Sequence, residues 1–169
     1  MTEKFMGKAP EISATAWVHP AACVIGQARL SDGVSVWPGA VIRADVDRIE
    51  VGAGTNIQDL AVLHPNRNRP VILGLGVTVG HSAVIHGSLI GDHCLIGMGA
   101  VVMDSEIGEQ CIVAAGAVVP PGSKIPPRRM VMGLPGRAVR ALGEDEIKGL
   151  FRSEQDYLEL TALYRKEHA

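Results

Sequence analysis

The stretch VGHSAVIHGSLIGDHCLIGMGAVV, residues 79–102, repeats with a period of six, and this period indicates the fold class. Large aliphatic residues stand six apart within it, at Val79 and Ile85 and again from Ile90 onward. This period matches neither the 3.6-residue turn of a helix nor the simple alternation of a strand. It is typical of a solenoid in which each side of a coil is one short strand and a turn.

The same period continues outward through most of the chain. Its aliphatic positions are Ile12, Val18, Val24, Leu30, Val36, Ile42, Val51, Ile57, Leu63, Leu73, Val79, Ile85, Ile90, Ile96, Val102, Ile107, Val113, Val119, Ile125 and Val131. Small residues stand four positions after the first six of these, at Ala16, Ala22, Ala28, Val34, Ala40 and Val46. We expect both kinds to point inward, with three sides per coil and coils stacked about 4.8 Å apart. The sequence therefore predicts an all-β solenoid, a parallel β-helix.

Two insertions and a change of period divide the chain further. The insertions lie around RADVDRIE and HPNRNRP, follow the same side, and should project from one corner, where solenoids build binding surfaces. The β-helix is predicted over residues 1–133, and an extended connector with a C-terminal α-helix over residues 134–169. Apolar residues recur at helical spacing from about 144 to 167, and the acids after Gly143 suit a helix start.

Composition excludes several classes of function. The 169 residues carry a formal net charge of −2 and include two each of Trp, Tyr and Phe, which suits neither a nucleic-acid surface nor a base-stacking platform. No apolar run approaches the length of a membrane span or a signal peptide. Three cysteines without paired spacing fit a reducing compartment. We therefore expect a cytoplasmic protein with no nucleic-acid or membrane partner.

Three histidines interrupt the repeat in a pattern that suggests a metal. His64 and His86 each follow an inward aliphatic residue and occupy equivalent outward positions on neighbouring coils, about 4.8 Å apart. Arg43 holds the same position one coil earlier. His81 comes from the preceding side and joins the pair either within one chain or across a subunit boundary. Three neutral imidazoles with a vacant fourth position suit zinc, which then lowers the pKa of bound water to about 7. The alternative interpretation is three ordinary surface histidines.

Triangular parallel β-helices of this kind resemble hexapeptide-repeat proteins, and that resemblance implies left-handed winding. The run VIRADVDRIEVGAGTNIQDLAVLH followed by VGHSAVIHG, with the closing GLPGRAVR, resembles the gamma-class carbonic anhydrase family over nearly the whole chain. The resemblance implies a lyase that hydrates CO2 reversibly to bicarbonate by zinc-bound hydroxide at the subunit interfaces of a homotrimer. The metal is expected to be Zn2+, or alternatively Fe2+ or Co2+.

The resemblance also implies a role for individual residues. It assigns His64 and His86 of one chain, with His81 of the adjacent chain, as metal ligands. Gln58, and less directly Asn56, resemble the side chains that hydrogen-bond the metal-bound water or bicarbonate, and are the expected catalytic residues. A second set resembles the network that holds the trimer together: Arg43 and Asp59 form an intersubunit ion pair, and Asp45 belongs to the same network.

The sequence departs from the family where active members carry proton-exporting glutamates. Val46 occupies one such position, and the basic loop PNRNRP replaces the other. Because fast hydration needs a proton acceptor of suitable pKa, these changes predict reduced turnover without affecting metal binding. Asp47 and His93 are candidate substitutes. The alternatives are an acyl-CoA thioesterase, a hexapeptide acyltransferase, or a metal-stabilised trimer with little activity.

Overall fold

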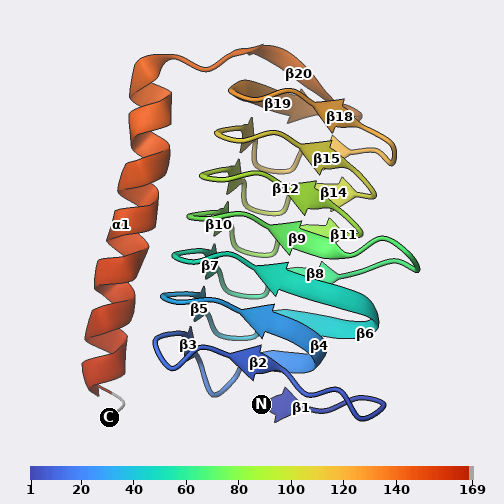
Figure 1. Ribbon diagram of the computed structural model, residues 1–169. Coiled ribbons are helices and arrows are strands. Elements are labelled where there is room, and N and C mark those ends of the chain that lie inside the picture. Colours follow the sequence, from blue (N-terminus) through green and yellow to red (C-terminus); the bar gives the residue numbers. More distant parts are fainter. Residues whose placement is uncertain (168–169) are drawn as a thin grey trace.

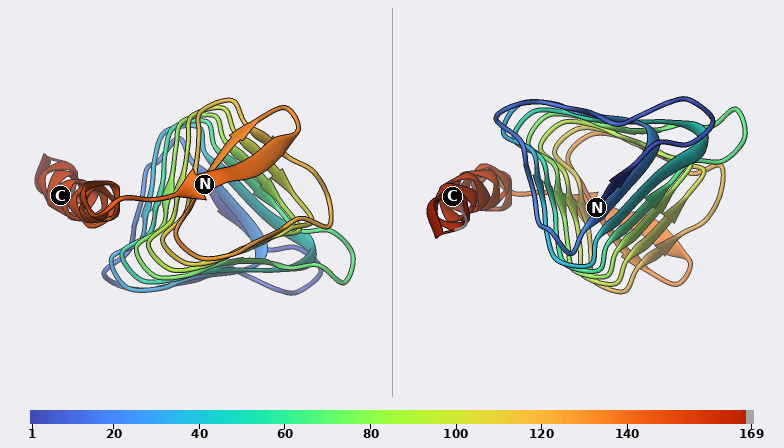
Figure 2. Two further views of the ribbon diagram at one scale, coloured as in Figure 1. Left: turned by 90° about the horizontal axis from the view of Figure 1, so that it is seen from above. Right: turned by 90° about the horizontal axis from the view of Figure 1, so that it is seen from below.

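The structure is a computed structural model that describes residues 1–167, so the last two residues of the predicted 134–169 segment lie outside it. Short strands coil upward into a stack, and one long helix, α1 (Glu144–Glu167), stands beside it (Figure 1). Viewed along its axis, the stack is triangular, and the helix lies outside one side (Figure 2). The predicted left-handed parallel β-helix with a C-terminal α-helix is confirmed.

One side of the triangle is an 8-stranded sheet. Its members, in spatial order, are β3 (Trp17–Val18), β5 (Ser35–Val36), β7 (Asn56–Ile57), β10 (Thr78–Val79), β13 (Leu95–Ile96), β16 (Ile112–Val113), β19 (Arg129–Gly133) and β20 (Gly136–Ala141). All pairs are parallel except the last, in which β20 turns back antiparallel on β19 and closes the top of the stack.

The other two sides belong to a 12-stranded sheet that bends around a corner. The long strands β4 (Cys23–Leu30) and β6 (Val41–Val51) run through this corner without a turn. One side continues with β8 (Val62–His64), β11 (Val84–His86), β14 (Val101–Met103) and β17 (Val118–Val119). The other continues with β9 (Val71–Leu73), β12 (Leu89–Ile90), β15 (Glu106–Ile107) and β18 (Lys124–Ile125), while β1 (Thr2–Glu3) and β2 (Glu11–Ile12) pair with β4.

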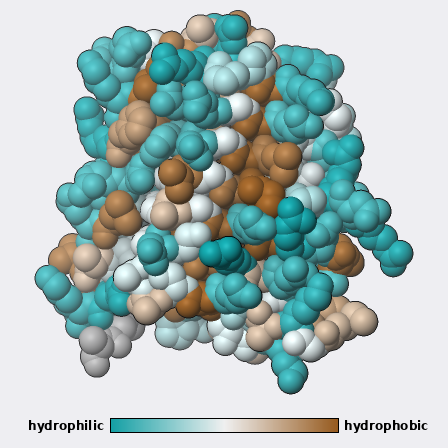
Figure 3. Space-filling model, viewed as in Figure 1, coloured by the Kyte–Doolittle hydropathy of each residue, from teal (hydrophilic) through white to brown (hydrophobic). Residues whose placement is uncertain are grey.

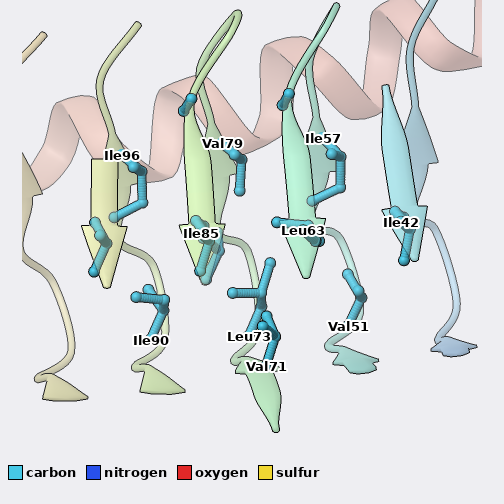
Figure 4. Close-up of a cluster of buried hydrophobic side chains, with 14 of the residues drawn as sticks. Ile42, Val51, Ile57, Leu63, Val71, Leu73, Val79, Ile85, Ile90 and Ile96 are labelled. Carbon is cyan, nitrogen blue, oxygen red and sulfur yellow. The ribbon is translucent and has the colours of Figure 1, made fainter. Parts of the chain in front are cut away.

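The core is the ladder of aliphatic side chains that the period predicts. Figure 4 shows these side chains pointing into the triangle from successive coils, with Leu63 and Ile85 stacked on one side and Ile57 and Val79 on another. These four side chains are fully buried. Only the ends of the ladder are partly buried, at Ile12, Val18 and Ile125. The core therefore follows from period alone, because every coil repeats the same inward positions.

The predicted inward position of Val46 is wrong. The side chain of Val46 is 45% exposed. In the pairing of β4 with β6, Gly26 pairs with Ala44 and Ala28 pairs with Ile49. The segment of β6 between its two paired residues is therefore longer than the matching segment of β4. The insertion therefore bulges outward at the corner, and Val46 lies on the bulge.

The helix α1 covers the 8-stranded sheet and contacts β5 and β10. Its buried side chains are Ile147, Leu150 and Thr161. At its start, Glu146 Oε2 accepts the backbone N–H of Gly143 at 3.0 Å, and Arg140 binds the same carboxylate with two N–H groups. The first contact satisfies the backbone donor of Gly143, directly before the helix, and the Arg140 contacts hold the helix to the end of the connector.

Aromatic rings fasten the far end of the helix. The rings of Trp17 and Trp37 lie 5.0 Å apart edge to face, and Tyr164 of the helix contacts both, with its ring centre 5.5 Å from that of Trp17 and 5.0 Å from that of Trp37. Tyr157, about two turns earlier in the helix, packs on Trp37. Over residues 1–167, no helix combines the length and the apolar character needed to cross a bilayer.

Candidate metal centre

His64 and His86 end the neighbouring strands β8 and β11, and the parallel register sets them directly opposite each other. Because side chains alternate along a strand, the aliphatic residue before each histidine points into the core and the imidazole points outward. The ring centres lie 5.2 Å apart and the ring planes are tilted by 41°. The two imidazoles are thus paired on the outside of one side of the triangle, as predicted.

Each ring of this pair has a carboxylate beside it. Asp45 Oδ1 lies 2.9 Å from His64 Nε2, and the other oxygen of Asp45 accepts a hydrogen bond from Arg43. Burial of Asp45 favours its neutral form, but the hydrogen bonds from His64 and Arg43 outweigh that effect and hold the pKa of Asp45 below its ordinary value. Asp104 Oδ1 lies 3.9 Å from His86 Nδ1.

His81 lies at a different corner of the same chain. It stands in the turn between β10 and β11, with Nδ1 at 2.8 Å from Asp59 Oδ2. His86 is the last residue of β11, whose three extended residues span about 10 Å from this turn. Two nitrogens on one zinc need to approach to about 3.4 Å. Within residues 1–167, no three His, Cys, Asp or Glu side chains come together as a metal site, so His81 does not join the pair within one chain.

The donor set fits a divalent metal. Each of the three imidazoles has one ring nitrogen facing a carboxylate, from Asp45, Asp59 or Asp104. Histidines that bind metals almost always offer their second N–H to such an oxygen, which fixes the ring and its tautomer. Neutral imidazole nitrogens are good ligands for Zn2+, Fe2+ and Co2+.

A buried polar chain lies beside His81. Gln58 Nε2 donates to Asn56 Oδ1 at 3.1 Å, and Asn56 Nδ2 donates to Thr78 Oγ1 at 3.0 Å. Thr78 Oγ1 lies 3.2 Å from Ser153 Oγ of α1. Gln58, Thr78, His81 and Ser153 also line a cavity of about 310 Å³ whose remaining wall is mainly apolar. The network holds the Gln58 carboxamide at the rim of this cavity.

The insertions project from the corner next to His64 and His86, as predicted. The segment 65–70 forms a tight loop in which Asn66 and Arg69 bridge each other through their backbones, and it extends sideways from the stack (Figure 1). Arg69 Nη1 donates to the backbone oxygen of Asp104, whereas the Arg67 side chain is exposed. Of the two candidate proton acceptors, Asp47 lies on the β6 bulge near Asp45, and His93 lies against α1.

His93 is therefore not placed for proton export. Its Nδ1 lies 2.9 Å from Glu154 Oε2, and its ring centre is 4.4 Å from that of Phe151. Both partners belong to α1, so His93 fastens the helix to the stack. Cys94 and Cys111 are buried in the core.

Three polar residues at the candidate site are not among those predicted from the sequence. Thr78 and Ser153 complete the chain that ends at Gln58, and Asp104 accompanies His86. Nothing in the sequence relates Ser153 to Thr78, because they are 75 residues apart and meet only when α1 packs on β10. Asp104 could have been found from the repeat. Met103, the last residue of β14, lies in register with His86, and Asp104 is the next residue, whose backbone N–H donates to the carbonyl oxygen of His86.

A second groove is lined by none of the three histidines and by none of the polar residues around Gln58. Brown, apolar side chains form a strip along the face seen in Figure 3, with hydrophilic side chains on either side. A groove of about 610 Å³ runs over β9, β12, β15 and β18 and is lined by Ile72, Leu89, Ile107 and Ile125 with Glu106 and Lys124. It lacks a cluster of polar groups that converge on a ligand, so it is not the candidate site.

None of the protein-family models compared with the chain matches it. Individual relatives do. A protein named "Probable carbonic anhydrase" from Methanocaldococcus jannaschii is 46% identical over 151 residues, which cover 89% of this chain and 95% of that protein. Gamma carbonic anhydrase 1, mitochondrial, from Arabidopsis thaliana is 40% identical over 96% of this chain, which spans 62% of its length.

A solved structure agrees in fold. A hexapeptide transferase family protein from Anaplasma phagocytophilum superposes with a TM-score of 0.93 at 34% identity, covering 96% of this chain and 97% of that one. The identity to the archaeal relative extends over nearly the full length of both proteins. Together with the in-register histidines, it shows that this chain belongs to the gamma-class carbonic anhydrase-like family of hexapeptide-repeat proteins.

Proposed function

We propose that the protein is a metal-dependent carbonic anhydrase that interconverts CO2 and bicarbonate at sites shared between the subunits of a homotrimer. His64 and His86 of one subunit and His81 of the next would hold Zn2+, or alternatively Fe2+ or Co2+. Such a cation, held by three imidazoles, makes its bound water acidic near neutral pH. The observation that carries the proposal is the in-register pair His64 and His86, with a carboxylate beside each ring.

The residues around the pair support specific tasks. Gln58 is buried and held by Asn56, so its carboxamide is oriented before substrate arrives and can hydrogen-bond a bicarbonate oxygen. Arg43 and Asp45 lie against His64, and Asp59 lies against His81. In a trimer that brings His81 next to the pair, Arg43 and Asp59 would approach each other across the same boundary. We propose that they form the intersubunit ion pair.

Proton export limits the proposed reaction. The exposed Val46 cannot accept a proton, and the loop 65–70 carries arginines instead of acids. We therefore expect hydration that is measurable but slow in weak buffer.

The test combines metal content with activity. Protein purified without added metal is analysed for bound elements, and zinc-, cobalt- and iron-loaded samples are assayed by stopped-flow CO2 hydration. We expect one metal per subunit, lost in His64→Ala and His86→Ala, and hydration that depends on the metal. Full metal loading without hydration under any of the three metals would favour a metal-stabilised trimer with little activity. A protein that binds none of them would contradict the proposal.

A second candidate function is acyl transfer or thioester hydrolysis. It is supported by the mainly apolar cavity beside Gln58 and His81, and by the likeness to a hexapeptide transferase family protein. In that case His81 would act as a base without metal. Turnover of an acyl-CoA that persists in the presence of a chelator would favour this alternative over the first.

A further inference from the structure

Asp104 occupies an unusual position in the turn that follows β14. Its φ of 42° is in the left-handed region, which non-glycine residues seldom adopt. Its backbone N–H donates to the carbonyl oxygen of His86 at 2.8 Å, one coil below. The turn thus sets the Asp104 side chain directly over the end of the strand that carries His86.

The carboxylate of Asp104 is pressed against this strand end. A Cβ atom on Gly87 would lie 2.2 Å from Asp104 Oδ1, so only glycine leaves room for the oxygen there. Oδ1 is buried and makes no hydrogen bond with any residue from 1 to 167, and it lies 3.9 Å from His86 Nδ1. A buried carboxylate oxygen without a hydrogen-bond partner destabilises the folded chain. The fold therefore tolerates a cost to keep a carboxylate beside this imidazole.

The insertion loop fixes Asp104 from the other side. Asn66 Nδ2 donates to Asp104 Oδ2 at 3.4 Å, and Arg69 Nη1 donates to its backbone oxygen at 3.1 Å. The two contacts leave Oδ1 as the oxygen that faces His86. A loop that appears from sequence to be a solvated insertion thus has an anchoring role at the candidate metal centre.

Asp92 is a second aspartate whose carboxylate lies close to a glycine of the coil below, and it serves as a comparison. Its Oδ1 also lies over a glycine, since a Cβ atom on Gly74 would be 2.2 Å from it. There, however, Oδ1 accepts the backbone N–H of Leu75 at 2.9 Å, so the carboxylate serves the coil itself. Asp104 Oδ1 approaches a glycine just as closely but makes no such bond, and it lies 3.9 Å from an imidazole proposed to bind metal.

We propose that Asp104 is a positioning residue for His86: its unpartnered Oδ1 faces Nδ1 at 3.9 Å, a small side-chain rotation lets it accept the Nδ1–H, and this directs Nε2 of His86 toward the metal. The inference rests on the metal site proposed above. A carboxylate in this role fixes the tautomer and the ring orientation of the ligand, and loss of such a partner lowers metal affinity by about 10- to 100-fold.

The test measures Co2+ binding to the intact trimer by competition with a chelator, together with the visible spectrum of the bound cobalt. For Asp104→Ala we expect a Kd about 10- to 100-fold higher than that of the wild type and a changed spectrum. Asp104→Asn keeps an oxygen that can accept the Nδ1–H, and should recover most of the lost affinity. Asp92→Ala is the matched control: it should lower stability while leaving the cobalt Kd and spectrum unchanged.

The outcomes separate this inference from the function on which it rests. A wild-type protein that binds no cobalt contradicts the metal site itself. A wild type that binds cobalt, with Asp104→Ala equal to it in Kd and spectrum, overturns the role of Asp104 alone. If Asp104→Ala does not fold, 15N NMR of the metal-free wild type decides, because it shows which ring nitrogen of His86 carries the proton. A proton on Nδ1 supports the inference and a proton on Nε2 overturns it.

Discussion

Replacing Asn56 by alanine should damage both stability and hydration, because Asn56 is the central member of the buried polar chain. It accepts from Gln58 and donates to Thr78, and all three side chains are at least 95% buried. Thr78 keeps its contact with Ser153, but Gln58 loses the partner of its NH2 group. One orphaned buried polar group costs about 1–3 kcal/mol, so we expect the free energy of unfolding to fall by about 2 kcal/mol.

Urea unfolding at a fixed protomer concentration measures this loss, since the stability of the proposed trimer would depend on concentration. Metal content should stay at the wild-type level, while CO2 hydration falls because Gln58 is no longer held in one orientation. Ser153→Ala is the matched control: it removes the outer end of the chain and leaves the bond between Gln58 and Asn56 intact. It should lower both stability and hydration less than Asn56→Ala does. An Asn56→Ala protein with wild-type stability and wild-type hydration would refute the network's proposed role.

Two further predictions concern the helix cap and proton export. The pKa of Glu146 is lowered to about 2 by the hydrogen bonds from Arg140 and the Gly143 backbone, so its contribution to stability is complete above about pH 4.5 and lost toward pH 2. Wild type and Glu146→Gln should therefore differ less in free energy of unfolding as the pH falls from about 4.5 toward 2. Urea titrations at several pH values measure this difference. An equal difference at pH 6 and pH 3 would contradict the assigned cap. Val46→Glu places an acid on the exposed bulge near Asp45, and should raise CO2 hydration in weak buffer by roughly tenfold or more without altering metal content; unchanged hydration would show that proton export does not limit the rate.

The repeat predicts most of the fold because it is locally encoded. Each coil places an aliphatic residue at the same inward position, so Leu63 and Ile85 can be assigned to the core without knowing any distant contact. The prediction failed at Val46, where the insertion in β6 changes the pairing with β4 and moves the residue outward. A period identifies regular coils, but it does not show how an added residue is accommodated.

The candidate site could be predicted only in part. His64 and His86 follow from the repeat, because equivalent positions on neighbouring coils must stack. Gln58 and Asn56 were proposed from family resemblance, and the structure adds the hydrogen bond between them. Ser153 depends on how α1 packs on β10, and such a contact between distant segments leaves no periodic signal in the sequence. Asp104 does have a place in the repeat, but its contact with the insertion loop does not follow from the period.

Mixing two defective variants tests whether one metal is shared by two subunits. His64→Ala keeps His81, and His81→Ala keeps the pair His64 and His86, so each variant alone should bind almost no metal. When the two are refolded together in equal amounts, about one quarter of the boundaries in a random trimer join the intact pair to an intact His81. We predict that the mixture recovers about one quarter of the wild-type metal content per subunit. A mixture that recovers none, or a His81→Ala protein that holds the full complement on its own, would contradict the shared site.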